Sequence, residues 1–202
     1  MRAFIAVDLS EEIRAKIKEV QQQFAVPEIE ARSGIKLKFV NPTQAHQTVK
    51  FLGDVPDKRG EELKRALATI RQEPFTIALR GVGFFPKASL EKARTIRVVW
   101  IGLEKGVKEL KALQEEVESK MYALGFPYEK QFSAHVTICR VKTQVRSRAE
   151  IEPMLTKIAE MRDGDVGEML LDTLKLKKST LTPEGPIYED VYVKRLTAQV
   201  IK

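Results

Sequence analysis

The feature that most constrains this chain is a short pattern, Ala-His-x-Thr, that occurs twice inside apolar, strand-like segments. The first copy carries His46 and Thr48, and the second carries His135 and Thr137. These are the only two histidines, and they lie 89 positions apart (135 − 46), close to half the length of 202 residues. In an extended strand, residues i and i+2 project from the same face, so each imidazole has a hydroxyl beside it. The chain is therefore expected to contain two similar halves, each built around one such strand.

The segments around each His-x-Thr pair follow one order, namely strand, helix, strands and helix. Apolar stripes at helical spacing predict four helices. These lie between Ser10 and Pro27, between Arg59 and Pro74, from Val107 to Gly125, and from Ile151 to Asp163. Alternating or continuous apolar runs predict strands over 1–8, 36–40, 45–53, 75–79, 96–101, 131–140, 166–180 and 187–195. We expect an aromatic loop over 81–86.

The connections between these segments decide the fold class. The turn residues over 182–186 predict a hairpin between the last two strands. Such antiparallel hairpins favour an α+β fold over a doubly wound parallel sheet. Neither Gly-x-Gly-x-x-Gly nor Gly-x-x-x-x-Gly-Lys-Ser/Thr occurs, so nothing supports a Rossmann or P-loop nucleotide site. We expect residues 1–202 to form one domain of two interleaved lobes, each carrying one His-x-Thr strand.

Charge narrows the class of partner only in part. There are 35 lysines and arginines against 28 acidic residues, which gives a net charge of +7 and a sequence pI of about 9.4. A positive field favours anionic partners without identifying them. No apolar run is long enough to span a membrane, and the apolar segment at 1–8 is too short for a signal sequence. We therefore expect a cytoplasmic protein without a membrane partner.

Cysteine and metal chemistry find little support. Cys139 is the only cysteine, so the chain has neither an internal disulfide nor a cysteine-based metal site. By strand parity it shares a face with His135 and Thr137, so one interpretation is a thiol nucleophile. The interpretation that we favour is a small buried hydrophobic residue. The two histidines have no obvious third ligand in their segments, so we expect neither a metal nor another cofactor.

Two imidazoles facing each other across a cleft would supply an acid and a base for one displacement. Each threonine hydroxyl could donate a hydrogen bond to an anionic oxygen between them. Lys50, Arg140 and Lys142 lie beside the motifs and could add positive charge. These groups suit cleavage of a phosphoester without a metal. The alternative is that each histidine is a half-buried strand residue satisfied by its hydroxyl neighbour.

A nucleotide substrate would also need an aromatic surface on which its base can stack. Phe84, Phe85 and Phe132 are the candidates. The alternative, which is the commoner role for a phenylalanine, is that each ring belongs to the hydrophobic core.

Both motifs resemble the paired signatures of the two-histidine phosphoesterase superfamily. Within it, the chain resembles the RNA 2′,3′-cyclic phosphodiesterases, also called the 2′-5′ RNA ligase family. The likeness covers His46-Gln47-Thr48-Val49-Lys50-Phe51-Leu52-Gly53 and Ser133-Ala134-His135-Val136-Thr137-Ile138-Cys139-Arg140. It extends to Arg2–Asp8, Val82–Pro86, Arg97–Trp100 and Lys178–Tyr188, so it runs nearly from end to end.

The resemblance implies a bilobal α+β fold, in which two antiparallel sheets with flanking helices are related by a pseudo-two-fold axis around a basic cleft. It also implies metal-independent hydrolysis of a 2′,3′-cyclic phosphate to a 2′-phosphomonoester. On the family pattern, His46 is the proton donor to the departing 3′ oxygen and His135 is the proton acceptor that activates water. Thr48 and Thr137 hold the phosphate. The implied partners are RNA with cyclic phosphate ends or cyclic nucleotides.

The residues expected to bind substrate are Arg140, Lys50, Phe84 and Phe132. Arg140 matches a position that the family uses near the substrate. Its strand parity is opposite to that of His135, so it can reach the cleft only if the strand ends or bulges before it.

Gln47 departs from the family pattern, which usually has an aliphatic residue there, and a buried amide needs hydrogen-bond partners. Two other functions remain open: a module that binds RNA ends or nucleotides without turnover, and reversible 2′-5′ RNA ligation. Nothing in the sequence demands a dimer, so we expect a monomer.

Overall fold

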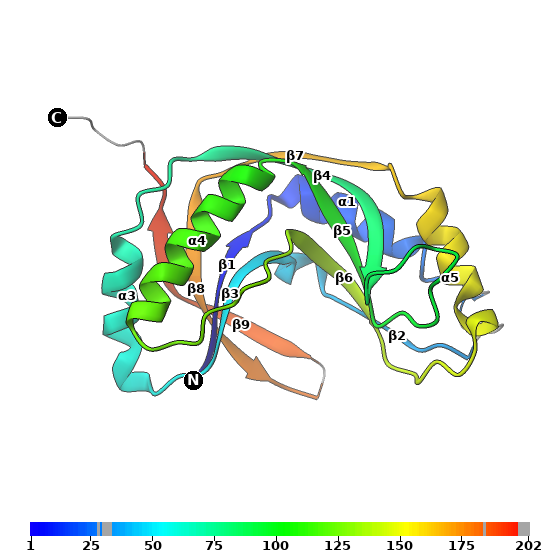
Figure 1. The fold of residues 1–202 in the computed structure, drawn as a ribbon, viewed down its shortest axis with the longest axis horizontal. Helices are drawn as coiled ribbons and strands as arrows, with labels where there is room; N and C mark the ends of the chain where they lie inside the picture. The colour runs from blue at the N-terminus through cyan, green and yellow to red at the C-terminus, as the bar shows by residue number, and fades with distance from the viewer. Residues whose placement is uncertain (28, 30–33, 184, 198–202) are drawn as a thin grey trace.

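The computed structural model describes residues 1–27, 29, 34–183 and 185–197, and two antiparallel sheets form the frame of this part of the chain (Figure 1). The first sheet has the order β3 (His46–Asp54), β1 (Arg2–Asp8), β8 (Thr173–Leu181) and β9 (Pro186–Arg195). The second has the order β2 (Leu37–Phe39), β6 (His135–Val141), β5 (Val98–Lys105), β4 (Phe75–Phe85) and β7 (Asp165–Leu171). Each sheet therefore contains one His-x-Thr strand, and the expected α+β class with two antiparallel sheets is confirmed.

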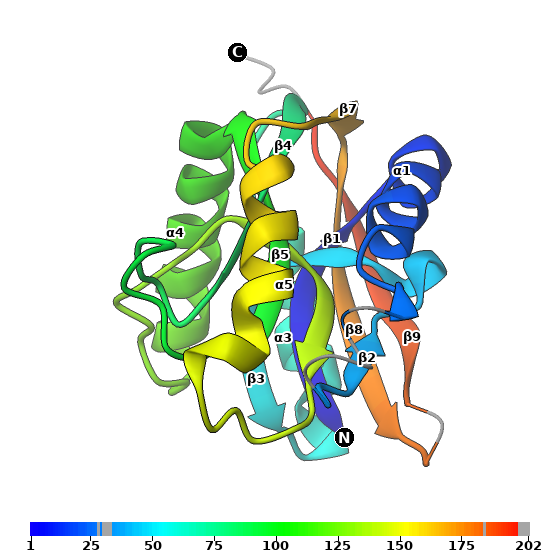
Figure 2. The same ribbon diagram turned by 90° about the vertical axis from the view of Figure 1, so that its right-hand side faces the viewer.

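Helices flank the two sheets. In the described residues they are α1 (Glu11–Gln22), α3 (Gly60–Ala68), α4 (Val107–Ala123) and α5 (Arg148–Glu160), with 3₁₀ turns at Pro42–Gln44 and Asp57–Arg59. Helix α1 begins where its sequence predicts, because the Ser10 Oγ accepts a hydrogen bond from the Ile13 backbone N–H at 3.3 Å. In Figure 2, α4 and α1 flank the strands from opposite sides.

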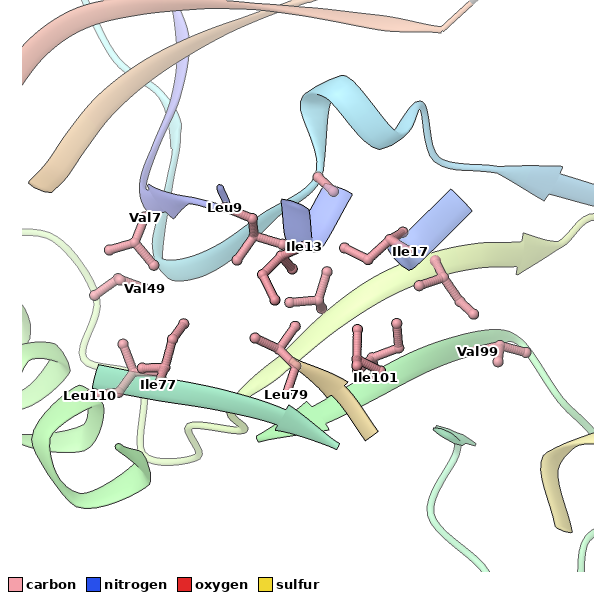
Figure 3. Close-up of a cluster of buried hydrophobic side chains, with 14 of the residues drawn as sticks. Val7, Leu9, Ile13, Ile17, Val49, Ile77, Leu79, Val99, Ile101 and Leu110 are labelled. Atoms are coloured by element: carbon pink, nitrogen blue, oxygen red, sulfur yellow. The ribbon is translucent and has the colours of Figure 1, made fainter. Parts of the chain in front are cut away.

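The hydrophobic core is shared by both sheets. Figure 3 shows Val7 and Val49 from the first sheet and Leu79 and Ile101 from the second, with Ile13 of α1 between them. All five side chains are buried, and they belong to one cluster that draws on both sheets and on the helices. Burial of this apolar surface therefore holds the two His-x-Thr strands in one framework.

A β-bulge interrupts each His-x-Thr strand directly after its threonine. On β3, Thr48 pairs with Ala6 and Lys50 pairs with Ile5, so Val49 is the extra residue. On β6, the extra residue is Ile138, between Thr137 and Cys139. A bulge reverses the alternation of side chains beyond it, because one residue is added to a period of two. The reversal decides which of the following residues share a face with the histidines.

Two expectations about the strands were wrong. The aromatic loop expected over 81–86 is the end of β4, which continues to Phe85. Gly81 has a φ of +73° at a register shift between Arg80 and Val82, so here the glycine accommodates a bulge and does not end the strand.

The single long strand expected over 166–180 is also wrong. It is two strands, β7 and β8, which meet at Asp172 and belong to different sheets. A smaller difference concerns β5, which begins at Val98 and runs to Lys105, beyond its expected end at Ile101.

Candidate active site

His46 is the first residue of β3, and its ring is held by the backbone of the preceding turn. Its Nδ1 lies 2.8 Å from the carbonyl oxygen of Gln44. Since a carbonyl can only accept, Nδ1 carries the proton and Nε2 on the far edge of the ring is left for chemistry. The ring of Phe4 lies 4.9 Å away and that of Tyr188 lies 5.2 Å away, between ring centroids. Burial lowers the pKa of His46, and the bond to Gln44 opposes that shift only in part.

His135, the first residue of β6, repeats this arrangement. Its Nδ1 lies 2.8 Å from the carbonyl oxygen of Ser133, again the residue two positions before the histidine. The ring of Phe85 stands edge-on at 5.0 Å between centroids. Burial lowers the pKa of His135 against the opposing bond to Ser133, and the positive charges of Arg140 and Lys87 lower it further. Two histidines from distant segments thus have the same tautomer and the same direction of pKa shift.

The threonines share the less buried face of each strand with the histidines. On β3, His46 and Thr48 are half-buried whereas Gln47 between them is buried. On β6, His135 and Thr137 are half-buried around the buried Val136. The alternation that the sequence predicts therefore holds over each motif, up to the bulge.

The side chain of Gln47 joins the two motif strands. Its Oε1 accepts a hydrogen bond from the backbone N–H of His135 at 2.6 Å, and its Nε2 donates to the carbonyl oxygen of Thr48 at 2.7 Å. The partners that this buried amide needs are therefore present. The beginning of β6 in the second sheet lies within one hydrogen bond of a side chain from β3 in the first.

Lys50, which we expected to bind substrate, instead points into the interior. It is only 1% exposed, and its Nζ lies 2.6 Å from the Glu118 Oε1 and 2.8 Å from the Pro127 carbonyl oxygen. The bulge at Val49 causes this change, because it turns Lys50 away from the face of His46. The expectation rested on unbroken alternation and is corrected here.

The same bulge geometry has the opposite consequence for Arg140. The extra residue on β6 places Arg140 on the same face as His135. The strand therefore contains the bulge that Arg140 needs to reach this face. Arg140 is exposed. Its charge lowers the pKa of His135 and opposes the upward shift that burial gives to the pKa of Tyr188. Since Tyr188 packs on His46, the Arg140 guanidinium is within electrostatic reach of the surroundings of both histidines.

Cys139, the residue after the bulge, is a buried hydrophobic residue, as we favoured. It is completely inaccessible, and burial raises the pKa of its thiol to about 12. A thiol with that pKa is almost entirely protonated at neutral pH, so it does not provide a nucleophile.

The three phenylalanines considered for base stacking occupy different environments. Phe84 is buried in the hydrophobic core, so its expected contact with substrate is corrected. Phe85, the next residue on β4, faces His135 instead. Phe132 is partly buried against the core, and its contact with substrate stays a prediction.

Sequence reasoning missed a charged cluster beside His46. The Lys177 Nζ lies 3.0 Å from the Asp8 Oδ1 and 2.6 Å from the Asp190 Oδ1. A cavity of about 360 Å³ adjoins this cluster and is lined by Asp8, Arg14, Thr43, Gln44, Lys177, Tyr188 and Asp190. The cross-strand register of β8 and β9 brings Lys177 opposite Asp190. The turn residues that predict the hairpin of β8 and β9 could have suggested a cross-strand ion pair. They do not predict the bulge that brings Lys177 opposite Asp190.

Within the described part of the chain, no group of three or more His, Cys, Asp or Glu side chains has an arrangement that could hold a metal ion. No described helix has both the length and the apolar character needed to cross a bilayer.

Comparison with known sequences identifies related proteins. A model of the LigT-like phosphoesterase family matches residues 7–96 and 101–188, and each segment contains one His-x-Thr pair. The chain is 38% identical over 194 residues to an RNA 2′,3′-cyclic phosphodiesterase from Archaeoglobus fulgidus, with 96% of this chain and 99% of the relative covered. A protein of the same name from Methanothermobacter thermautotrophicus is 36% identical over 198 residues, covering 97% of this chain and 99% of the relative.

Solved structures show the same fold. The protein TT0787 of Thermus thermophilus superposes with a TM-score of 0.73 at 28% identity, covering 98% of this chain and all of that one. The E. coli LigT structure with bound 3′-AMP superposes with a TM-score of 0.72 at 23% identity, covering 97% of this chain and 98% of that one.

Proposed function

This chain belongs to the LigT-like phosphoesterases of the two-histidine superfamily, and we propose that it hydrolyses 2′,3′-cyclic phosphate ends of RNA to 2′-phosphomonoesters. The relatives named above carry that substrate in their names. The observation that carries the proposal is the matched pair of histidines, each bound through Nδ1 to a carbonyl two residues earlier. Both rings therefore keep Nε2 for proton transfer.

In the proposed reaction, His135 and His46 act on opposite sides of the phosphorus atom. The neutral His135 Nε2 takes a proton from water as the water oxygen forms a bond to phosphorus. The bond from phosphorus to the 3′ oxygen breaks, and the protonated His46 donates its Nε2 proton to that oxygen. The products are a 2′-phosphomonoester and a 3′ hydroxyl, and the proton lost by His46 is balanced by the one gained by His135.

The remaining groups stabilise charge and fix geometry. Negative charge on the non-bridging oxygens would be met by hydrogen bonds from the Thr48 and Thr137 hydroxyls, and by the Arg140 guanidinium. The carbonyls of Gln44 and Ser133 hold each imidazole in one tautomer and one orientation. Because protonated groups and fixed dipoles supply the positive potential here, we infer that the reaction needs no metal ion.

The direct test uses a short RNA with a 2′,3′-cyclic phosphate end in buffer containing EDTA. The wild-type protein is expected to give the 2′-phosphate, separated from the 3′-phosphate by chromatography. His46→Ala and His135→Ala are each expected to abolish turnover, since each removes one of the two proton transfers. Full activity in either variant would eliminate the mechanism. RNA binding by wild type without any hydrolysis would favour the rival function, a module that binds RNA ends.

A further inference from the structure

The amide of Gln47 is placed so that both of its ends hold the backbone of the proposed catalytic strands. It is 1% exposed and lies on β3 between His46 and Thr48. Backbone groups fix its orientation without ambiguity, because the His135 N–H can only donate and the Thr48 carbonyl can only accept. One side chain therefore connects a residue of the first motif to a residue of the second.

The His135 N–H has no described strand partner on the side where Gln47 lies. β5 covers one edge of β6 and pairs Gly102 with His135. On the other edge, the pairing with β2 ends at Phe39 opposite Cys139, four residues after His135. Gln47 thus supplies the acceptor that a neighbouring strand would supply elsewhere in a sheet. Without it, the first residue of β6 would lose its direct connection to β3.

The second motif has no side chain that could form the equivalent hydrogen bond to the first. The residue of β6 that corresponds to Gln47 is Val136, which is buried and has no polar atom on its side chain. An aliphatic residue at position 47 would fill the same core position but would leave the His135 N–H without this acceptor. The hydrogen bond is therefore a property of the glutamine and not of the packing at this site.

A second contact from β3 holds the segment that leads into His135. The Lys50 Nζ donates to the Pro127 carbonyl at 2.8 Å, and its ion-pair partner Glu118 accepts from the Glu129 N–H at 2.9 Å. These bonds fix the approach to β6, whereas Gln47 fixes its first residue. β3 is thus connected to this part of the chain at two places: to the segment before β6 through Lys50, and to His135 itself through Gln47.

We propose that Gln47 is a positioning residue, which sets the separation of the two histidines by tying the His135 backbone to the strand of His46 and Thr48. This inference rests on the proposed function. In a two-histidine mechanism, the acid and the base must both lie within hydrogen-bond reach of one phosphate. A shift of about 1 Å in such an arrangement can lower a rate by about 10²-fold.

Gln47→Leu tests the proposal, since leucine fills similar volume but accepts no hydrogen bond. We expect kcat on a short RNA with a cyclic end to fall by about 10²-fold, with a much smaller change in KM. Val7→Ala is the matched control: Val7 is buried directly opposite Gln47 on β1 and contributes no side-chain hydrogen bond. Val7→Ala is expected to lower the melting temperature and to leave kcat near the wild-type value.

Gln47→Glu provides a readout that a purely structural role would not move. A protonated carboxyl can accept from the His135 N–H with one oxygen and donate to the Thr48 carbonyl with the other, whereas a carboxylate cannot donate. The ratio of the variant's kcat to that of wild type is therefore expected to be highest at acidic pH and to fall as the glutamate ionises. A ratio that does not vary with pH would count against the proposal.

Amide hydrogen exchange at His135 separates this inference from the proposed function, because it needs no substrate. We expect exchange at this amide to be at least about tenfold faster in Gln47→Leu than in wild type or Val7→Ala. If wild type hydrolyses the RNA while Gln47→Leu keeps full kcat and slow exchange, the role of Gln47 is overturned. If wild type hydrolyses no cyclic phosphate, the proposed function fails, and unchanged exchange in Gln47→Leu would then also refute the link between the strands.

Discussion

At the scale of single residues, the lowered pKa values of the two histidines predict how activity depends on pH. In the proposed reaction His135 must be neutral, so its lowered pKa extends activity to more acidic pH. His46 must be protonated, so its lowered pKa causes activity to decline earlier as pH rises. Both limbs of a bell-shaped kcat/KM profile are thus displaced downward, and the maximum is expected below the ordinary histidine value of about 6.5.

This profile can be measured on a nucleoside 2′,3′-cyclic phosphate. Arg140→Gln serves as the comparison, because the Arg140 charge lowers the pKa of His135. Its removal is expected to raise that pKa and move the acidic limb to higher pH, whatever it does to KM. A maximum above pH 7 in wild type would contradict the assignment of the two limbs to these histidines, whose pKa values are both lowered.

The sequence predicts which face of the strand a side chain occupies up to each threonine, but not beyond it. Strand alternation was enough to place each histidine and its threonine on one half-buried face. It failed for Lys50, which the bulge at Val49 turns inward, and it left Arg140 dependent on a bulge that the structure contains. A bulge depends on register with neighbouring strands, which local residue patterns do not record.

At the scale of elements, the ends of strands were hard to predict. Gly81 suggested a loop, yet it lies inside β4 at a bulge, where the carbonyl of Arg162 passes close by. The alternation over 166–180 was real, but it could not show that the chain changes sheets at Asp172. Helix signals were more reliable: the cap at Ser10 and the apolar stripe through Ile13 and Ile17 follow from neighbours on the same helix.

The close approach at Gly81 leads to a stability prediction. Gly81 and Gly125 both have positive φ, +73° and +85°, so alanine at either is strained by about 1–2 kcal/mol. A Cβ on Gly81 would also lie 2.2 Å from the Arg162 carbonyl oxygen, whereas one on Gly125 would meet no atom within 4 Å. Denaturant unfolding should therefore show a clearly larger loss for Gly81→Ala than for Gly125→Ala. Equal losses would mean that conformation alone, and not the contact with Arg162, requires glycine at 81.

At the scale of the whole molecule, the duplicated pattern predicted the plan of the fold. Each sheet contains one His-x-Thr strand, and the family model matches the chain in two segments with one pair each. The pattern does not predict how the two halves contact each other. That contact depends on a core drawn from both sheets and on the polar bonds of Gln47 and Lys50, which join residues 88 and 68 positions apart.

The net charge of +7 adds a prediction that distinguishes RNA from a mononucleotide as substrate. If the positive field contacts phosphates upstream of the cyclic end, binding of RNA releases counterions, and each such contact on a single strand adds about 0.7 to the slope of log K against log salt. We expect kcat/KM for a short RNA with a cyclic end to fall more steeply with salt than kcat/KM for a nucleoside 2′,3′-cyclic phosphate. The mononucleotide controls for effects of salt on the catalytic groups, because in the proposed reaction both substrates place one cyclic phosphate between the histidines. Equal slopes would show that the protein contacts the cyclic phosphate alone and that its excess of basic residues plays no part in choosing RNA.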